Sequence, residues 1–398
     1  MTFLCISCYF KGAPFLRACK AAGNTVLLLT AKKLAHEDWP REAIDEFFYL
    51  ENDSNSAANL ADIAKGFAWM MQRQRIDRIV AMDDFDVEKA AYLREEFRLP
   101  GMGQTTARYF RDKLAMRMQA RDRGIPVPQF TSLFNDVELT DFANSVVYPC
   151  LIKPRGEASA TGITKVHSAQ ELWEKVHSLG ERRKDYLVEQ FRPGDVYHVD
   201  AISVDGEIVF CQVSRYLSTP FEVAHGGGIF RSVSVPYHDP DAVTLRRMTE
   251  SVMHVFGMQY SASHTEFIRT EAGFVFLETA SRVGGAHLAE MVEAATGISL
   301  WQEWAKLETA MATGNQYRLP SRRYDQAGII VSLSRFERPD TSGFTDPEIV
   351  WRMDKKQHIG LIVASQSTER VRELLDWYAQ RIGQNFHASA PVPVKSAH

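Results

Sequence analysis

The segment 262–287 constrains the fold of this chain more than any other, because it combines a β-hairpin pattern with acidic residues. Two strand-like stretches flank a Gly-containing turn within it, which predicts a hairpin. Glu266 and Glu278 stand in apolar strand context, where a carboxylate is costly unless a cation pairs with it. With Arg282 just beyond, the hairpin is either an anionic pocket for one or two Mg²⁺ ions or an edge hairpin with two solvent-facing glutamates. Taken alone, the hairpin favours the second interpretation.

Short apolar runs alternate with helical segments in the N-terminal third. The runs cover residues 2–7, 25–30 and 76–82, with a helical segment at 57–74. This alternation is typical of a parallel sheet in an α/β domain, where sites form at the carboxyl ends of strands. Asp83 and Asp84 lie at such an end and are open candidates for a substrate-side role, whereas Asp86 is expected to cap the helix 87–97. No GxGxxG follows the first run, so a dinucleotide fingerprint is absent.

The middle of the chain places two lysines near a loop of small residues. An amphipathic helix is expected over 105–123 and carries Lys113, and a strand carries Lys153 near its end. The loop 155–162 contains small residues that can bring backbone N–H groups against phosphate oxygens, although it is not a Walker A motif. A further strand is expected at 186–191. Each of these signals is weak when taken alone.

The remaining chain predicts a large antiparallel unit. Strands or helices are expected at 197–203, 207–214, 241–256, 287–296, 327–334, 360–364 and 368–382. Three consecutive glycines at 226–228 indicate either a mobile or ligand-approaching loop or a plain turn. Arg231 just after them is either a ligand for a substrate carboxylate or a surface residue. The tail after Phe386 is expected to be disordered.

In this order, the two lysines, the small-residue loop, the segment 188–191 and the two-glutamate hairpin resemble the ATP-grasp superfamily of carboxylate–amine or carboxylate–thiol ligases. The resemblance covers nearly the whole chain and implies an α/β and α+β fold: an N-terminal parallel-sheet pre-grasp domain and two lobes enclosing ATP. The expected division is 1–104 for the pre-grasp domain, 105–195 for the connector helix and small lobe, 196–325 for the large lobe with the metal site, 326–388 for the C-terminal segment completing that lobe, and 389–398 for the tail.

The resemblance also implies roles for residues at matching positions. Lys113 and Lys153 match the two lysines that meet the nucleotide phosphates. Glu266 and Glu278 match the Mg²⁺ ligands. Arg282 matches the arginine that steadies the transferred phosphoryl group and the acyl phosphate.

The nucleotide lid and hinge are matched in the small lobe. Within the loop 155–162, Ser159 is the side chain expected to lie over the β- and γ-phosphates. Glu189, Gln190 and Phe191 match the hinge that receives the adenine.

Two positions depart from the family pattern. Val196 stands where the family often has a glutamate for the ribose, and His198, on the same strand, is the expected substitute. Ala280 stands where the family often has an asparagine that completes the second Mg²⁺ site. A second metal ion would then rely on Glu278 with water.

These implications predict an ATP- and Mg²⁺-dependent ligase. A carboxylate becomes an acyl phosphate, an amine attacks it, and ADP and phosphate leave; amino acids are the favoured substrates, giving an amino-acid or dipeptide ligase. Two alternatives remain, a purine-pathway type ligase and a nucleotide-binding protein with a degenerate site. The second alternative is motivated by Val196 and Ala280.

The composition argues against nucleic-acid and membrane partners, so the expected partners are the small-molecule carboxylate and amine that the resemblance implies. The net charge is −4 over 398 residues, and no basic stripe with interleaved aromatics indicates nucleic-acid binding. No apolar stretch approaches the ~20 residues of a membrane span, and the N-terminus lacks a signal-peptide pattern. Five scattered cysteines predict no disulfide framework, and Cys5 and Cys8 are read as core residues of the first strand. A cytoplasmic enzyme is expected, and a homodimer follows from the resemblance and from how common twofold dimers are.

Overall fold

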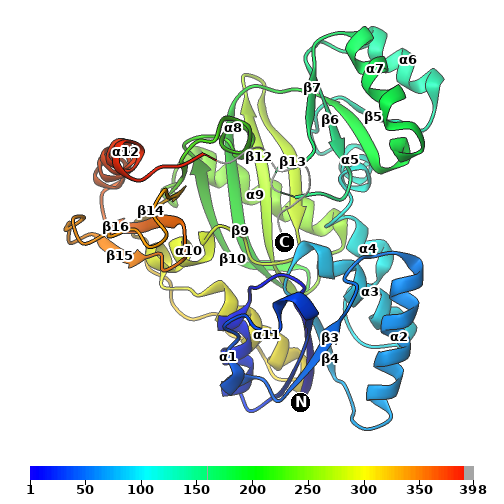
Figure 1. The fold of residues 1–398 in the computed structure, drawn as a ribbon, viewed down its shortest axis with the longest axis vertical. Helices are drawn as coiled ribbons and strands as arrows, with labels where there is room; N and C mark the ends of the chain where they lie inside the picture. Colours follow the sequence, from blue (N-terminus) through cyan, green and yellow to red (C-terminus); the bar gives the residue numbers. More distant parts are fainter. Residues whose placement is uncertain (159, 390–398) are drawn as a thin grey trace.

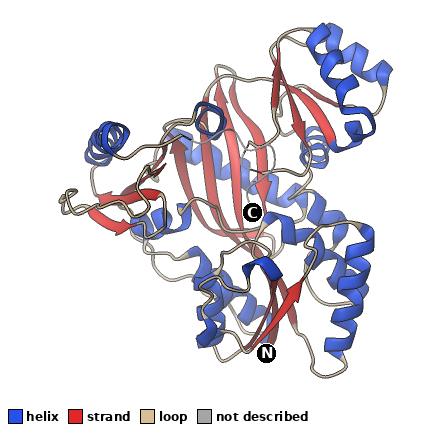
Figure 2. Cartoon of the chain, viewed as in Figure 1, coloured by secondary structure: helices blue, strands red, loops and turns tan. Residues whose placement is uncertain are grey.

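The computed structural model describes residues 1–158 and 160–389, so the predictions for Ser159 and for residues 390–398 lie outside the described chain. Figure 1 shows three bodies: an N-terminal domain (blue, bottom), a small lobe (green, upper right) and a large central sheet extended at one side by the C-terminal segment (orange to red). Each body has its own sheet, and helices cover the sheets (Figure 2). None of the described helices is long and apolar enough to cross a membrane.

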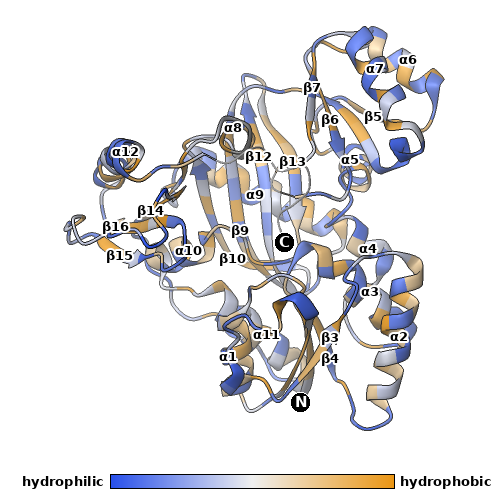
Figure 3. Cartoon of the chain, viewed as in Figure 1, coloured by the Kyte–Doolittle hydropathy of each residue, from blue (hydrophilic) through white to orange (hydrophobic). Residues whose placement is uncertain are grey.

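The N-terminal domain is built on a parallel sheet in the order β3-β2-β1-β4, as the alternating pattern predicts. Its strands are mostly hydrophobic, which is typical of strands buried on both faces (Figure 3). The sequence analysis did not predict β3, an edge strand whose Tyr49 is exposed. The elements are β1 (Thr2–Ile6), α1 (Ala13–Ala21), β2 (Thr25–Ala31), β3 (Glu46–Leu50), α2 (Ala57–Met71), β4 (Arg78–Ala81) and α3 (Val87–Glu96), with short 3-10 turns at Lys32–Leu34, Arg41–Ala43 and Asp84–Asp86.

The predicted helix cap at Asp86 is wrong. Asp86 already has helical backbone angles, φ −95° and ψ −15°, and makes no side-chain cap hydrogen bond. A capping side chain needs an extended backbone at the cap, so this carboxylate instead accepts a hydrogen bond from the Cys8 backbone N–H at 2.9 Å. Asp83 caps the preceding 3-10 turn, accepting from the Phe85 N–H at 3.1 Å.

The single helix expected over 105–123 is also wrong, because the chain forms two helices, α4 (Gln104–Arg108) and α5 (Lys113–Asp122). Asp112 between them is extended, and its carboxylate accepts from the N–H of Leu114 at 3.0 Å and of Ala115 at 3.4 Å. This N-cap starts a new helix. Lys113 is therefore the first residue of α5 rather than a residue in the middle of a longer helix.

The small lobe is an antiparallel sheet in the order β5-β8-β6-β7, with two helices on it. Its apolar core consists of its own residues, from Leu133 to Val188. The strands predicted around Lys153 and at 186–191 are both present. The elements are β5 (Phe130–Ser132), α6 (Asp136–Ser145), β6 (Cys150–Pro154), β7 (Thr164–Val166), α7 (Ala169–Leu179), a 3-10 turn (Gly180–Asp185) and β8 (Tyr186–Gln190).

The large sheet is antiparallel throughout, in the order β13-β12-β9-β10-β11-β14-β16-β15. The predicted two-glutamate hairpin is β12–β13, and the predicted C-terminal strands and helix extend the sheet. The elements are β9 (Asp195–Val204), β10 (Glu207–Tyr216), α8 (Pro220–Gly226), β11 (Phe230–Ser234), α9 (Pro240–Phe256), β12 (Ser261–Thr270), β13 (Gly273–Ala280), α10 (Leu288–Thr296), α11 (Leu300–Thr313), β14 (Gln326–Leu333), β15 (Ile349–Arg352), β16 (His358–Ser365) and α12 (Thr368–Asn385).

Alternation along β9 separates the two faces of the large sheet. Tyr197 and Val199 belong to the apolar core that α9 covers, whereas Val196 belongs to the core beside α10 on the other face. Because side chains alternate along a strand, His198 and Asp200 share the face of Val196. That face turns toward the small lobe and the N-terminal domain and carries the polar residues discussed below.

Two other expectations need correction. The three glycines do not form one loop: Gly226 ends α8, Gly227 is the left-handed residue that terminates this helix, with φ 63°, and Gly228 lies in the short connection to β11. The disorder expected after Phe386 does not hold for His387, which bridges to Ser334 and whose Nδ1 lies 2.8 Å from the Ser332 hydroxyl.

Helix α11 joins the N-terminal domain to the large lobe. Its Trp304 packs edge-on against Phe15 of α1, with ring centres 5.2 Å apart. Its Glu308 forms a buried ion pair with Arg78 of β4 at 2.5 Å. Figure 1 shows α11 (yellow) beside α1 (blue), although they are far apart in sequence. One apolar core therefore runs from the N-terminal sheet into the large lobe.

Candidate active site

A cavity of about 530 Å³ lies between the small lobe, the large sheet and the N-terminal domain. We call it the interlobe cavity. Its walls come from α5, β6, the loop after β6, β8, β12, β13 and the segment after β4. Six charged side chains that the sequence predicts for the site line this cavity: Lys113, Lys153, Glu189, Glu266, Glu278 and Arg282. The fold thus brings together residues that are up to 169 positions apart, from 113 to 282.

A buried ion-pair triad forms the cavity wall at the small lobe. Glu189 on β8 accepts from Arg117 Nε at 2.9 Å and also pairs with Lys153 on β6. Burial would raise the pKa of the Glu189 carboxyl, but the charges of Arg117 and Lys153 lower it to about 2. Glu189 is therefore ionised, and its carboxylate holds Lys153 at the cavity.

Lys113 links the small lobe to the two-glutamate hairpin. Its Nζ lies 2.9 Å from Glu278 Oε2 and donates to the Glu157 carbonyl oxygen at 2.7 Å. Burial acts to raise the pKa of Glu278, and the charge of Lys113 is the largest influence lowering it. The lysine therefore contacts both the loop 155–162 and the hairpin, from its position at the start of α5.

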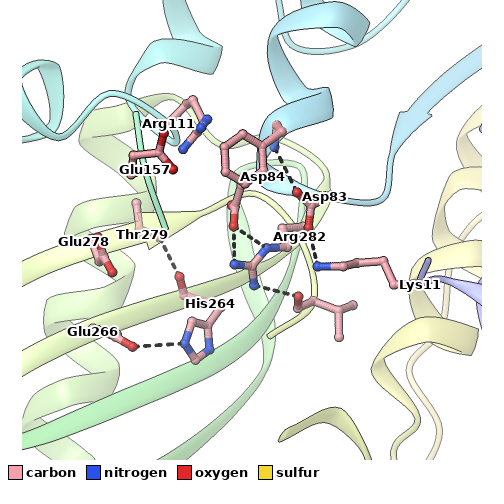
Figure 4. A network of polar contacts seen from close by, with 12 residues as sticks. Lys11, Asp83, Asp84, Arg111, Glu157, His264, Glu266, Glu278, Thr279 and Arg282 are labelled. Carbon is pink, nitrogen blue, oxygen red and sulfur yellow. Dashed lines mark hydrogen bonds and ion pairs between the residues drawn. The ribbon is translucent and has the colours of Figure 1, made fainter. Parts of the chain in front are cut away.

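Glu266 and Glu278 face each other across the hairpin, as direct partners on β12 and β13. Glu266 accepts from the Tyr216 hydroxyl at 2.8 Å and lies 3.5 Å from His264 Nε2. Figure 4 shows both carboxylates on the same side of the sheet. Two carboxylates lining one cavity are the hard oxygen ligands that Mg²⁺ prefers, so these residues fit such an ion.

His264 and His198 flank a shared carboxylate beneath the cavity. The Nδ1 atoms of both rings lie 2.8 Å from Asp200 oxygens. Burial acts to lower the pKa of His264, but the carboxylates of Asp200 and Glu266 raise it to about 10. The loop at Gly284 covers this group so closely that a Cβ there would lie 2.8 Å from Asp200 Oδ1. Glycine is required at that position for this close approach.

Arg282 is held by the N-terminal domain. Its Nε donates to Asp84 Oδ2 at 2.9 Å, its Nη2 contacts the same oxygen, and its Nη1 donates to the Val283 carbonyl at 2.8 Å (Figure 4). Burial would raise the pKa of Asp84, but the Arg282 charge lowers it to about 2. The arginine at the end of the hairpin is therefore oriented by the residue at the carboxyl end of β4.

The depressed pKa of Asp84 predicts an acid-dependent loss of stability. A carboxyl whose pKa falls from 3.8 to about 2 on folding stabilises the fold above pH ~4 and loses this contribution as the pH falls toward 2. We expect Asp84→Asn to lower the unfolding free energy by about 2 kcal/mol at pH 7 and by much less at pH 2.5. Urea unfolding at both pH values measures this, and an equal loss at both would contradict the ion-pair explanation.

Two predicted site residues lie away from the cavity wall. His198 is fully buried, and its second nitrogen, Nε2, lies 2.8 Å from the Ser232 hydroxyl, so its ring is below the wall rather than in it. Arg231 pairs with Asp376 of α12 at 2.5 Å. The ribose role of His198 and the substrate role of Arg231 stay predictions that this geometry does not favour.

The predicted hinge residues line the cavity where β8 ends. The Gln190 amide donates to the Val147 carbonyl at 3.2 Å. The Phe191 ring lies 3.9 Å from Lys165 Nζ and 6.5 Å from the Phe221 ring. An aromatic and a polar side chain at this end suit a planar base.

Sequence reasoning missed several residues of the site. Arg117, which is 1% exposed, follows Lys113 by four residues, and this spacing puts both on one helix face once α5 is known to start at Lys113. Tyr216 and Arg111 also line the cavity. No local pattern distinguishes them from core or surface residues.

Comparisons with known proteins show what the chain is similar to. A family model described as the C-terminal part of D-ala D-ala ligase matches residues 120–219. An L-arginine-specific L-amino acid ligase of Bacillus subtilis is 28% identical over 233 residues, 57% of this chain and 56% of that protein. A D-alanine–D-alanine ligase of Ralstonia pickettii is 32% identical over 26% of this chain and 32% of its own length. The chain thus matches about half, or less, of the length of these two relatives.

Solved structures match nearly the whole chain. An L-amino acid ligase from Bacillus licheniformis has a TM-score of 0.73 at 18% identity, over 97% of this chain and 98% of that one. An N5-carboxyaminoimidazole synthetase from Staphylococcus aureus, solved with ADP, has a TM-score of 0.71 at 16% identity over 95% and 96%. The three sheets, the interlobe cavity and these likenesses lead to one conclusion: the chain has the ATP-grasp fold.

Proposed function

We propose that this protein is an ADP-forming ligase that activates a carboxylate as an acyl phosphate for attack by an amine. The observation that carries the proposal is the convergence of Lys113, Lys153, Arg282 and two facing glutamates on one cavity. Phosphoryl transfer needs positioning and charge neutralisation more than an enzymic nucleophile. The cavity offers three cations and a pair of oxygen ligands for that purpose.

The ion pairs of the cavity explain how its lysines become available to phosphates. When Lys153 turns to a phosphate, Arg117 still pairs with Glu189, so no buried carboxylate is left without a partner. When Lys113 turns, Glu278 is released to act as a metal ligand. Glu266 and Glu278 would hold a Mg²⁺ ion, whose charge would help to neutralise that of the phosphates.

The proposed reaction has two steps. The carboxylate oxygen first takes the γ-phosphoryl group from ATP and ADP leaves, with Arg282 beside the transferred group. The amine nitrogen then bonds to the carbonyl carbon, the bond from that carbon to the phosphate oxygen breaks, phosphate leaves with the electron pair, and a proton is released from the amine. The acyl phosphate hydrolyses in open water, so the loop 155–162 is proposed to cover it.

Amino acids are the proposed substrates. Support comes from the Bacillus subtilis relative and the Bacillus licheniformis structure, both named as L-amino acid ligases. Mg²⁺ dependence, a homodimer and a cytoplasmic location are proposed together with this activity. The homodimer follows from the resemblance to the family, Mg²⁺ dependence from that resemblance together with the two facing glutamates, and the location from the sequence patterns.

Phosphate release from Mg·ATP tests the proposal directly. The enzyme is supplied with the twenty L-amino acids, singly and in pairs, and the products are weighed by mass spectrometry. Release that requires two amino acids, with a dipeptide mass, is the expected result. Clear ATP binding without release for any acid and amine would instead support the degenerate-site alternative.

Lys153 provides a prediction about nucleotide affinity. We expect Lys153→Met to weaken Mg·ATP binding roughly 10- to 100-fold, because a charge-assisted contact to phosphate is lost. Glu189 keeps Arg117 as a partner, so the fold is expected to survive. Calorimetric titration measures the affinity, with Lys184→Met as the control, since Lys184 is 72% exposed on the same lobe. Equal affinities in both variants would remove Lys153 from the nucleotide site.

A further inference from the structure

The N-terminal domain contributes one end of the interlobe cavity, and two charged groups there have hydrogen-bonding capacity that the described residues do not use. Asp84 follows β4, and Arg111 lies in the turn between α4 and α5. Both line the cavity and both are more than nine-tenths buried, with 8% and 7% of their surface exposed. Neither takes part in the nucleotide contacts proposed above.

Arg111 differs from the other buried cations of the cavity. Lys113, Lys153, Arg117 and Arg282 each pair with a carboxylate. Arg111 donates instead to the neutral Gly156 carbonyl, and its Nε is buried with no hydrogen-bond partner among the described residues. Its guanidinium lies 4.2 Å from the centre of the Phe85 ring, which fixes its plane. A buried guanidinium with an unused donor is costly unless a ligand supplies the acceptor.

Asp84 offers the opposite charge beside it. Both hydrogen bonds from Arg282 go to Oδ2, so Oδ1 receives none from the part of the chain that is described. Arg111 is also close enough to help lower the Asp84 pKa, which places the two charges near each other. Figure 4 shows Asp84, Arg111 and Arg282 around the same space, with Glu157 of the loop next to Arg111.

An anion and a cation at one end of a buried cavity complement a small zwitterion. An α-amino acid carries an ammonium and a carboxylate on the same carbon, which matches this pair of charges. The direction of binding follows from Arg282, the residue beside the transferred phosphoryl group. The amine must lie next to the acyl phosphate, so the ammonium belongs at Asp84, which touches Arg282, and the carboxylate belongs at Arg111.

We propose that Arg111 binds the α-carboxylate of the amino acid that supplies the amine, and that Oδ1 of Asp84 receives its ammonium group. This inference rests on the proposed ligase function and specifies it further. Acceptors are then α-amino acids, and simple amines or amino-acid esters are selected against. Arg111 is a specificity-determining residue in this assignment.

The test compares acceptors with and without the carboxylate. The full-length enzyme and Arg111→Gln are assayed by phosphate release and product mass, with L-amino acids and their methyl esters as acceptors. The ratio of kcat/KM for acid over ester is expected to fall roughly 10- to 100-fold in the variant, with most of the change in KM for the acid. Arg108→Gln, at an exposed arginine three residues earlier, is expected to keep the wild-type ratio.

The outcomes separate this inference from the ligase proposal. Dipeptide formation by the wild type, with an acid-to-ester ratio that Arg111→Gln leaves unchanged, overturns the role of Arg111 alone. No product with any acid or ester, while calorimetry shows Mg·ADP binding, overturns the ligase proposal as well. Calorimetry of Arg111→Gln with Mg·ADP is expected to stay within about twofold of the wild type, since Arg111 is not a nucleotide ligand.

Discussion

Glu278→Gln is expected to lower kcat at least roughly 1,000-fold while leaving the fold intact. Glu278 is the cross-strand partner of Glu266, and its carboxylate lies 2.9 Å from Lys113 Nζ. The amide keeps the shape of the side chain but removes the negative charge that a Mg²⁺ ligand supplies. Phosphate release measures the loss, and circular dichroism and urea unfolding check the fold.

The same hairpin offers a matched control for this variant. Glu271 lies in the exposed turn between β12 and β13, so Glu271→Gln removes the same charge away from the cavity and is expected to keep wild-type activity. Binding of Mn²⁺ in the presence of ADP, followed by electron paramagnetic resonance, provides a readout without turnover. Near-normal Mn²⁺ affinity in Glu278→Gln would contradict the metal assignment even if activity fell.

Arg117→Met is expected to lower the unfolding free energy by about 3–5 kcal/mol, the largest stability change among these variants. Arg117 is 1% exposed and pairs with Glu189, which is 2% exposed. Removing one member of a buried pair leaves the other charge insufficiently compensated. Lys153 remains as a partner, so the protein is expected to fold, and urea denaturation measures the loss.

Further substitutions distinguish the charge from the packing. Arg117→Met combined with Lys153→Met and Glu189→Met removes all three charges of the triad and is expected to recover much of the loss, because no charge there is left without a partner. Arg121→Met, one turn further along α5 and 54% exposed, is expected to change stability by less than about 0.5 kcal/mol. If the triple variant were no more stable than Arg117→Met alone, packing rather than charge would explain the effect.

Much of the fold could be predicted from local patterns. The first strand of the hairpin, residues 262–269, alternates in polarity. The strand with Lys153 and the N-terminal parallel strands are short apolar runs, so each of these strands had a clear local signal. The helix expected over 105–123 failed because a single capping residue, Asp112, outweighs helical periodicity. Helix α11 was not predicted. It joins the N-terminal domain to the large lobe through contacts with α1 and β4, and such long-range contacts leave no local sequence pattern.

The site residues that could be predicted are those whose type and order along the chain match a known pattern. Lys113, Lys153, the two glutamates and Arg282 stood out as an ordered set, and all of them line one cavity. Arg117 and Arg111 did not stand out, because an arginine on or near a helix is usually a solvated residue. Their burial depends on how the lobes pack, which sequence spacing does not describe.

The position of α11 also bears on the order in which the chain folds during synthesis. The N-terminal sheet is finished within the first hundred residues, yet part of its cover, including Trp304 and Glu308, emerges from the ribosome some two hundred residues later. Until then, Phe15 and Arg78 lack their partners. The small lobe has a core formed entirely by its own residues. We therefore expect the small lobe to become a stable unit during translation before the N-terminal domain that precedes it, the reverse of the usual order.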